Sequence, residues 1–282
     1  KFALAAIEPE LFTFLKNASV GVLLIGLIFL LKEGKELRTM HWKKWGQLAL
    51  IGLVGGAIPF VLFFEGLSLA TASSGAFVQK TLFLFSTVMA VLLLKEKMDV
   101  KMVGAAILLL AGNFLLLKMT AFSFGEGEFL ILLATLFWAA ENVLSKHALQ
   151  SLSGNIVGAA RMTFGGGFIL LYLLLTGGIS GVFALSPDAW MWIAFTTGML
   201  FLYVYTYYNG LKHISVSAAT SILLVGSPIT TLLSVLVTGT PITDAQIGGM
   251  VVFGWGVWLV LHAQRIPLPF ISPAQSHTRN GW

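Results

Sequence analysis

The sequence predicts an all-α polytopic membrane protein made of two inverted repeats of five transmembrane helices. Three observations support this fold class. The 282 residues are 57% hydrophobic and only 10% charged, and their mean hydropathy is +0.90, whereas a soluble domain carries about 25% charged residues. The second half of the chain repeats the first. Lysines and arginines gather in the loops on one side of the predicted helices.

The repeat is visible when the sequence is shifted by 144 positions, which lays residues 207–261 over residues 63–117 without a gap. The identical residues fall at turns and at small-residue packing positions. A duplicated hydrophobic half is typical of transporters built from structural repeats. The identical pairs are Gly66 and Gly210, Leu67 and Leu211, Ser73 and Ser217, Thr87 and Thr231, Val91 and Val235, Leu92 and Leu236, Gly104 and Gly248, Gly112 and Gly256, and Leu115 and Leu259.

Nine apolar stretches predict membrane-spanning helices, because a helix needs about 20 apolar residues to cross the hydrocarbon core. The joins after the second and the seventh of them are very short, so the helices on either side should be antiparallel neighbours. The stretches are 11–31, 46–69, 72–94, 101–117, 128–145, 155–176, 189–211, 216–237 and 246–261.

The repeat also predicts a tenth helix before the first residue of this chain. A shift of 145 lays residues 1–4 over residues 146–149 and Lys16 over Arg161. The apolar stretch 129–145 then has a partner only in a segment before Lys1, which we expect to be missing from this chain. The alternative is a first half with one helix fewer. The expected repeats are residues 1–124 and 125–263, followed by a disordered cytoplasmic tail over 264–282.

The charges predict the orientation. Five helices per repeat would invert the second copy relative to the first. One set of loops carries eleven Lys and Arg residues, against two on the other side, and basic loops mark the cytoplasmic side. We therefore expect a multi-pass protein of the inner cell membrane with a cytoplasmic C-terminus. The eleven are Lys32, Lys35, Arg38, Lys43, Lys44, Lys95, Lys97, Lys101, Lys146, Lys212 and Arg265, and the two are Lys1 and Lys118.

Composition argues against several other classes of function. The chain has no Cys, which excludes disulfides and Cys-ligated zinc, and its five His are scattered without the spacing of metal ligands. We expect no metal and no cofactor. The pI of about 9.5 does not indicate a nucleic-acid partner, because the basic residues lie in membrane loops. The expected partners are a small-molecule substrate and the lipid bilayer, and a homodimer is left open.

Several motifs resemble the paired repeats of EamA-type carriers in the drug/metabolite transporter superfamily. Both halves contain an aromatic-x-Gly-Leu helix ending, over 64–67 and 208–211, followed by a Ser- and Ala-rich helix start. Pro228 lies inside the next helix, and residues 95–97 form a short turn with a Glu. The resemblance covers residues 1–261 and implies transport of small metabolites, commonly amino acids or related compounds. Two positions depart from it: Thr240 stands opposite Glu96, and Lys80 lies where a Pro is common.

Five charged residues lie inside the predicted spans: Lys16, Glu65, Lys80, Glu141 and Arg161. A charge in the bilayer centre costs roughly 2.5–3.5 kcal/mol on insertion scales, so such residues usually face a cavity or a partner. Glu65 and Lys80 lie on neighbouring helices at depths that a lysine side chain can bridge. We expect an ion pair between them, with a structural role or a role in substrate binding.

The helix over 128–145 carries a polar stripe of Trp138, Glu141, Asn142 and Ser145, which share one face at spacings of three and four residues. We expect this stripe to line a central cavity. The alternative is that Glu141 only neutralises Arg161 on the following helix, and both can hold together.

The helix over 189–211 is rich in tyrosine. Tyr203 lies deep enough to line the same cavity. Tyr207 and Tyr208 lie near the cytoplasmic end, where tyrosine is common as an interfacial anchor, and we favour that role for both.

Glycines and prolines predict packing and bending. The glycine groups at 52–56, 165–167 and 248–256 indicate close helix contacts. Pro59 and Pro228 should bend their helices, and we expect these bends to act as gate pivots.

The favoured function is a secondary transporter that exports amino acids or related metabolites by alternating access around a polar cavity at the membrane midplane. Glu141 and Glu65 are the candidates for binding a substrate amine or for proton coupling, and Lys80 and Arg161 for a substrate carboxylate. A membrane-embedded enzyme would use one of the buried glutamates as a general acid, but the sequence lacks the usual accompanying catalytic groups. A non-transporting scaffold or receptor is the third reading.

Overall fold

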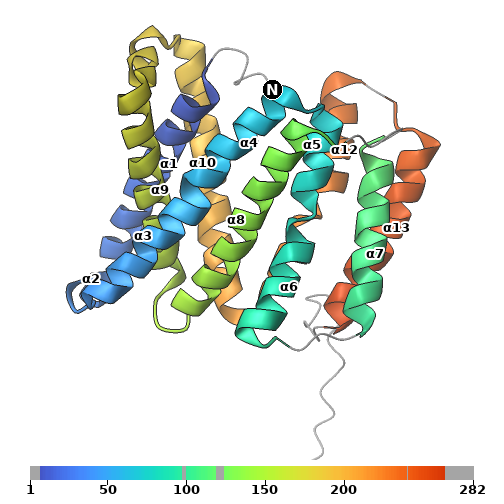
Figure 1. The fold of residues 1–282 in the computed structure, drawn as a ribbon, viewed down its shortest axis with the longest axis horizontal. Coiled ribbons are helices and arrows are strands. Elements are labelled where there is room, and N and C mark those ends of the chain that lie inside the picture. Colours follow the sequence, from blue (N-terminus) through green and yellow to red (C-terminus); the bar gives the residue numbers. More distant parts are fainter. Residues whose placement is uncertain (1–6, 97–99, 119–123, 240, 264–282) are drawn as a thin grey trace, which may run out of the picture.

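A computed structural model of the chain describes residues 7–96, 100–118, 124–239 and 241–263, and every regular element in this part is a helix (Figure 1). Among the described residues, eight helical spans are long and apolar enough to cross a membrane, three of them made of two consecutive helices, and α7 is a shorter apolar helix. The helical fold class is confirmed, and eight of the nine predicted stretches coincide with these spans, while the stretch 101–117 corresponds to the shorter helix α7. The expected tail over 264–282 lies outside the described residues. The helices are α1 (Pro9–Leu30), α2 (Gly34–Arg38), α3 (Trp42–Gly56), α4 (Ile58–Leu69), α5 (Ala72–Lys80), α6 (Leu82–Leu94), α7 (Val100–Leu116), α8 (Glu126–Ala148), α9 (Gly154–Thr176), the 3-10 helix η2 (Gly178–Ala184), α10 (Pro187–His213), α11 (Val216–Leu223), α12 (Gly226–Thr238) and α13 (Asp244–Ala263).

Side-chain caps explain where four of the helices begin. The hydroxyl oxygen of the residue before the helix accepts a hydrogen bond from a backbone N–H in the first turn, which satisfies a donor that has no partner inside the helix. The capping residues are Thr71, Ser153, Ser186 and Ser215. The joins between α4 and α5 and between α10 and α11 are as short as the sequence predicts.

Three of the membrane spans are interrupted helices. Ala57, with φ −127° and ψ −71°, separates α3 from α4, and Pro59 lies in the first turn that follows. Thr81 separates α5 from α6, and Leu224 and Val225 separate α11 from α12, in which Pro228 is near the start. Each of the two prolines therefore lies in the first turn after a helix break.

The repeat relates two of these interruptions to each other. A shift of 144 positions places Thr81 on Val225, and each of these residues directly precedes the second part of its span. The two copies thus keep the same helix break. They differ at Ala57, because its counterpart Phe201 lies inside the continuous helix α10.

Small residues let α3 approach α9 closely. A Cβ added at Gly56 would lie 2.8 Å from the Cα of Gly165, and one added at Gly165 would lie 2.7 Å from the Cα of Gly56. α7 and α13 pack in the same way, because a Cβ at Gly112 would lie 2.8 Å from the Cβ of Phe253. The predicted packing role of the glycines is confirmed at these positions, whereas Gly167, Gly248 and Gly254 face open space.

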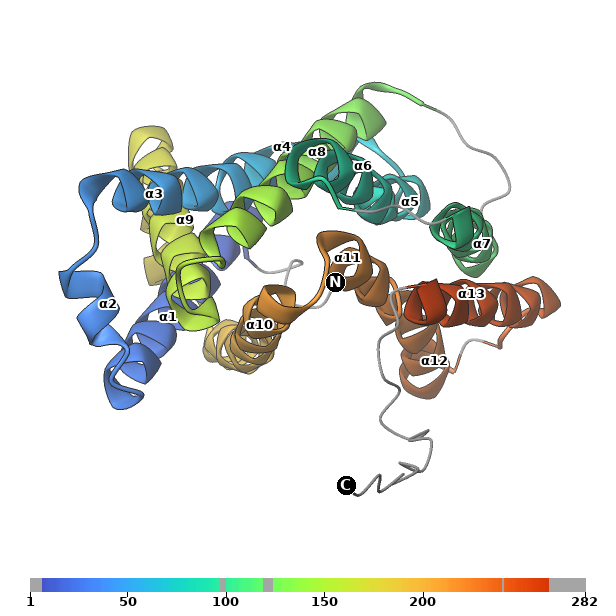
Figure 2. The ribbon, with the colours of Figure 1, turned by 90° about the horizontal axis from the view of Figure 1, so that it is seen from below.

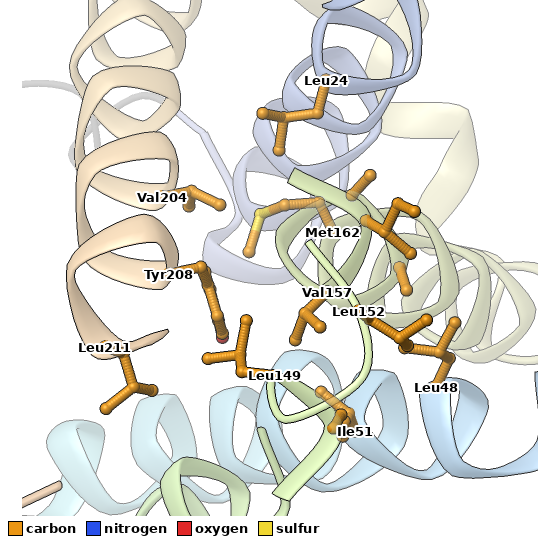
Figure 3. Close-up of a cluster of buried hydrophobic side chains, with 14 of the residues drawn as sticks. Leu24, Leu48, Ile51, Leu149, Leu152, Val157, Met162, Val204, Tyr208 and Leu211 are labelled. Carbon is orange, nitrogen blue, oxygen red and sulfur yellow. The ribbon is translucent and has the colours of Figure 1, made fainter. Parts of the chain in front are cut away.

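Seen from below, two rows of helices face each other (Figure 2). One row contains α3, α4, α8, α6 and α5, and the other contains α1, α10, α11 and α12, while α7 and α13 lie together at one end. At the left of Figure 1, α1, α9 and α10 pack into the largest buried apolar cluster. Figure 3 shows Leu24, Ile51, Met162 and Tyr208 within it.

Candidate functional site

A cavity of about 220 Å³ lies between the two rows of helices and brings together residues of α4, α5, α6, α8, α9, α10 and α11. Five of the residues that the sequence predicts for a site line it, and Glu65 and Lys80 do not. The lining residues are Phe60, Phe63 and Phe64 of α4, Gln79 of α5, Leu82 of α6, Trp138, Glu141 and Asn142 of α8, Arg161 of α9, Leu200, Tyr203, Tyr207 and Tyr208 of α10, and Leu223 of α11.

Glu141 and Arg161 form an ion pair in the wall of this cavity. Oε2 of Glu141 lies 3.7 Å from Nε of Arg161, and the two residues are 3% and 8% exposed. The guanidinium also donates from Nη2 to the backbone carbonyl of Gly55 at 3.0 Å. Its Nε is buried and has no hydrogen-bond partner among the described residues. The pair is therefore close enough for attraction but leaves a donor unused.

The carboxylate of Glu141 is held by two hydroxyl groups as well. Oε1 accepts hydrogen bonds from Ser145, one turn further along α8, and from Tyr208 of α10, both at 2.6 Å. Hydrogen bonds to a charged acceptor are stronger than those between neutral groups. Glu141 is thus fixed from three directions by side chains of α8, α9 and α10.

Asn142 links α8 to two other helices. Its Oδ1 accepts a hydrogen bond of 2.6 Å from the hydroxyl of Tyr207, and its Nδ2 donates to Ser86 Oγ at 3.3 Å. The indole of Trp138 donates to the backbone carbonyl of Gly55 at 3.1 Å. All four residues of the predicted polar stripe are buried. Trp138, Glu141 and Asn142 line the cavity, whereas Ser145 does not and supports Glu141.

The expected role of Tyr207 and Tyr208 as interfacial anchors is wrong. Tyr208 is 1% exposed, both rings line the cavity, and both hydroxyl groups donate to residues of α8. Position near a helix end suggested an anchor, but the side chains point inward. For Tyr207 the sequence did contain a signal, because it lies four residues after Tyr203 and so shares a helix face with it. The centroids of these two stacked rings are 5.5 Å apart.

An aromatic wall faces these polar groups, and the sequence analysis missed most of it. The ring of Trp138 packs on Phe60 at 5.4 Å and on Phe63 at 5.5 Å, and Phe64 lines the cavity beside them. The run over 60–64 carries no polar side chain, so its composition did not distinguish a cavity wall from a lipid-facing surface.

Gly55 is the position at which the backbone of α3 packs directly against the ion pair. A Cβ placed there would lie 2.2 Å from Cγ and 2.8 Å from Cδ of Glu141, and 3.1 Å from Nε of Arg161. Its carbonyl oxygen meanwhile accepts from both Trp138 and Arg161. Only a residue without a side chain lets the backbone of α3 reach the ion pair.

The predicted pair between Glu65 and Lys80 does not form. Glu65 is exposed on α4, and no ion pair joins it to Lys80 in the part of the chain that the structure describes. Lys80 instead lines a second cavity, of about 620 Å³, which shares no lining residue with the first. Lys16 lies apart from both cavities, with its ammonium 4.2 Å above the ring of Phe12.

Comparisons with known proteins agree with this architecture. The chain is 25% identical over 258 residues to the uncharacterized transporter YyaM of Bacillus subtilis, covering 88% of this chain and 83% of that protein. It is 26% identical over 185 residues to an uncharacterized transporter of Methanothermobacter thermautotrophicus, covering 62% of this chain and about half, 53%, of the relative's own length.

A crystal structure of a protein superposes with a TM-score of 0.77 at 21% identity, covering 94% of this chain and 91% of the other, which shows a shared fold. The EamA-like transporter family matches residues 1–118 and 125–262. These matches span nearly all of the helices described above. The chain therefore belongs to the EamA-like transporter family and is a multi-pass membrane transporter.

Proposed function

We propose that this chain is a secondary transporter that exports amino acids or related small metabolites by alternating access around the Glu141 cavity. The observation that carries the proposal is the buried pair of Glu141 and Arg161 in the wall of an aromatic cavity. Charged residues inside membrane spans usually mark substrate or ion pathways.

The pair suits a zwitterion because it offers both signs of charge at one place. Glu141 would accept the ammonium group of the substrate, and Arg161 would bind its carboxylate through the Nε that has no hydrogen-bond partner among the described residues. The separation of 3.7 Å is longer than a charge-assisted hydrogen bond. A substrate could therefore enter between the two groups without first breaking a direct hydrogen bond.

The aromatic wall would receive the rest of the substrate. Phe60, Phe63 and Trp138 present apolar ring faces, and Tyr203 adds an aromatic ring with a polar tip. Ligand pockets are mostly apolar, with a few polar groups that fix orientation. This combination favours small organic molecules over inorganic ions.

Two inverted repeats would supply the motion. In repeat transporters, discontinuous helices lie near the binding site, and one half rocks against the other. The equivalent breaks at Thr81 and Val225 lie beside the cavity, which both halves line. Pro59 and Pro228, each in the first turn after a break, would act as pivots.

The membrane placement follows from the charges. Basic loops mark the cytoplasmic side, so the C-terminus would be cytoplasmic and the membrane would be the inner cell membrane. Exposed apolar side chains on the outward faces of α1, α7 and α13, such as Leu30, Ile107 and Trp255, would contact lipid. They would also be available for a homodimer.

Counterflow tests the proposal directly. Proteoliposomes containing the purified full chain are loaded with an unlabelled mixture of amino acids and diluted into trace amounts of labelled ones. Transient accumulation above that of empty liposomes is expected for at least one amino acid. Preloaded cells should then lose that compound faster when the protein is present, if export is the direction. No accumulation for any amino acid would exclude the proposed substrate class.

A further inference from the structure

The second cavity, of about 620 Å³, is lined by α5, α12, the end of α7 and the start of α13. It shares no lining residue with the Glu141 cavity. Gln79 and Leu82 line the Glu141 cavity, whereas Lys80, between them in sequence, lines the second one. Likewise Leu223 lines the first cavity and Ser227 the second. Both cavities thus lie beside the same pair of interruptions but are lined by different residues.

The charged groups that line the second cavity are cationic. Lys80 and Lys118 contribute ammonium groups, and the described lining residues include no carboxylate. Lys80 is the ninth residue of the span Ala72–Leu94, which places it about 12 Å from the start of that helix at about 1.5 Å per residue. Lys118 is exposed and follows α7. One cation lies deep in the cavity and the other at its rim.

No residue in the described part of the chain supplies Lys80 with the partner that a membrane-embedded cation requires. It is half-buried, and it makes no ion pair or hydrogen bond with any residue of the described ranges 7–96, 100–118, 124–239 and 241–263. Glu65, its expected partner, does not reach it. Such a charge usually pairs with another group or faces a water-filled cavity. A cavity that an anion can enter would provide the missing partner.

Ser227 is a second group without a partner. It is 7% exposed, its Oγ is buried, and it has no hydrogen-bond partner among the described residues. Buried polar groups in proteins are normally hydrogen-bonded. Ser227 lies in the first turn of α12, a helix of 13 residues, where the positive end of the helix dipole favours an anion. Thr230 and Thr231 line the same wall, but their hydroxyl groups donate to the backbone carbonyls of Gly226 and Ser227.

We propose that this cavity is a second binding site, which takes a small organic carboxylate. Lys80 binds the carboxylate at depth, Ser227 donates its hydroxyl hydrogen to it, and Lys118 attracts the ligand at the rim. The volume lies within the usual range for ligand pockets, about 300–1,000 Å³. The site stands apart from the Glu141 cavity, and its existence does not depend on transport.

Binding of succinate to the purified full chain in lipid nanodiscs, measured by isothermal titration calorimetry, tests the proposal. Succinamide is the uncharged analogue of the same shape. Succinate is expected to bind at least about tenfold more tightly than succinamide, and Lys80→Gln should weaken it about tenfold, because a hydrogen bond to a charged group is lost. Lys80→Arg should keep the affinity within about threefold, since the charge remains.

Lys16→Gln is the matched control, because it removes the same charge from a span but outside both cavities. It should leave the affinity for succinate unchanged. Ser227→Ala serves as a second probe if Lys80→Gln fails to fold, and it should weaken binding about threefold through loss of one hydrogen bond.

Equal affinity of the wild type, Lys80→Gln and Ser227→Ala would overturn the proposal, as would the absence of binding by the wild type. Tighter binding of inorganic phosphate than of succinate would overturn the assignment to carboxylates. Lys80-dependent binding without any counterflow of amino acids would leave this site standing and count only against the proposed function.

Discussion

The carboxylate of Glu141 accepts a hydrogen bond of 2.6 Å from the hydroxyl of Tyr208 while its other oxygen lies 3.7 Å from Arg161. One carboxylate therefore connects α8 to both α9 and α10. Any movement of α10 relative to α8 must change the surroundings of the ion pair. If the substrate binds at this pair, as proposed, its binding and the motion of the helices would be coupled through Glu141.

Tyr208→Phe tests that connection. The substitution removes one hydrogen bond to a buried charged group, which contributes about 1.5–3 kcal/mol. We expect a counterflow rate at least about tenfold lower, with the protein still folded. Tyr205→Phe is the control, since Tyr205 is exposed on the same helix and stacks on Phe201 outside the cavity. If both variants transport equally, the Tyr208 bond has no part in the mechanism.

Gly55→Ala should damage the site without altering any charge. The added methyl group would lie 2.2 Å from Cγ of Glu141, so the ion pair or α3 must move, and overpacking of this kind costs about 1–3 kcal/mol. We expect a lower thermal stability of the purified protein and weaker substrate binding.

Gly104→Ala makes the same change on α7 where no atom lies within 4 Å. Its melting temperature should stay the same or rise slightly, because alanine is the better helix former. A Gly55→Ala protein as stable and active as Gly104→Ala would contradict the described contact.

Much of the fold was readable from the sequence because its signals are local. The lengths of the apolar runs predicted the membrane spans, and the repeat showed which positions are equivalent, such as Thr81 and Val225. The break at Thr81 itself was not predicted, since no proline marks it. The short helices α2 and η2 were also missed, because they lie in loops where no apolar period exists.

Only part of the site could be predicted, because the sequence does not show in which direction a side chain points. Spacing along α8 placed Glu141 and Asn142 on one face, which the structure confirms. Spacing cannot tell which neighbouring helix a residue faces. Glu65 and Lys80 lie at compatible depths but do not contact each other, whereas Tyr208 of α10 donates a hydrogen bond to Glu141 of α8. The partner of a long side chain depends on packing between helices, which one sequence does not encode locally.

Glu96 should hold the two halves together on the basic face. Its carboxylate accepts hydrogen bonds from the backbone N–H of Val216 at 2.7 Å and from the hydroxyl of Ser217 at 2.9 Å, at the start of α11. A carboxylate at a helix N-terminus contributes about 1 kcal/mol or somewhat more. Glu96→Ala should therefore favour opening of this face.

The chain has no native cysteine, so a single introduced one reports on that opening. Ser221→Cys places a thiol at a buried position of α11. Its reaction with a membrane-impermeant maleimide from the basic face should speed up several-fold in Glu96→Ala. Glu36→Ala, at an exposed position of α2 away from α11, is the control and should not change the rate. Equal reaction rates in Ser221→Cys alone and in combination with Glu96→Ala or Glu36→Ala would show that Glu96 does not hold the two halves together.

Pro228→Ala tests the proposed pivot. A proline near the start of α12 prevents the helix from continuing through the break, so replacement should let α11 and α12 join and stiffen. We expect substrate binding to persist while turnover falls at least about tenfold. Pro187→Ala, at the first position of α10, should have little effect on turnover. Unchanged turnover in Pro228→Ala would exclude the pivot.

Counterflow by Glu141→Gln, compared with Glu10→Gln, tests the central claim most directly. Glu10→Gln removes the same charge from the first turn of α1, outside both cavities. If Glu141 binds the substrate amine or couples a proton, Glu141→Gln should abolish accumulation of the labelled amino acid while Glu10→Gln transports like the wild type. Transport by Glu141→Gln at the wild-type rate, with the same dependence on pH, would contradict the account.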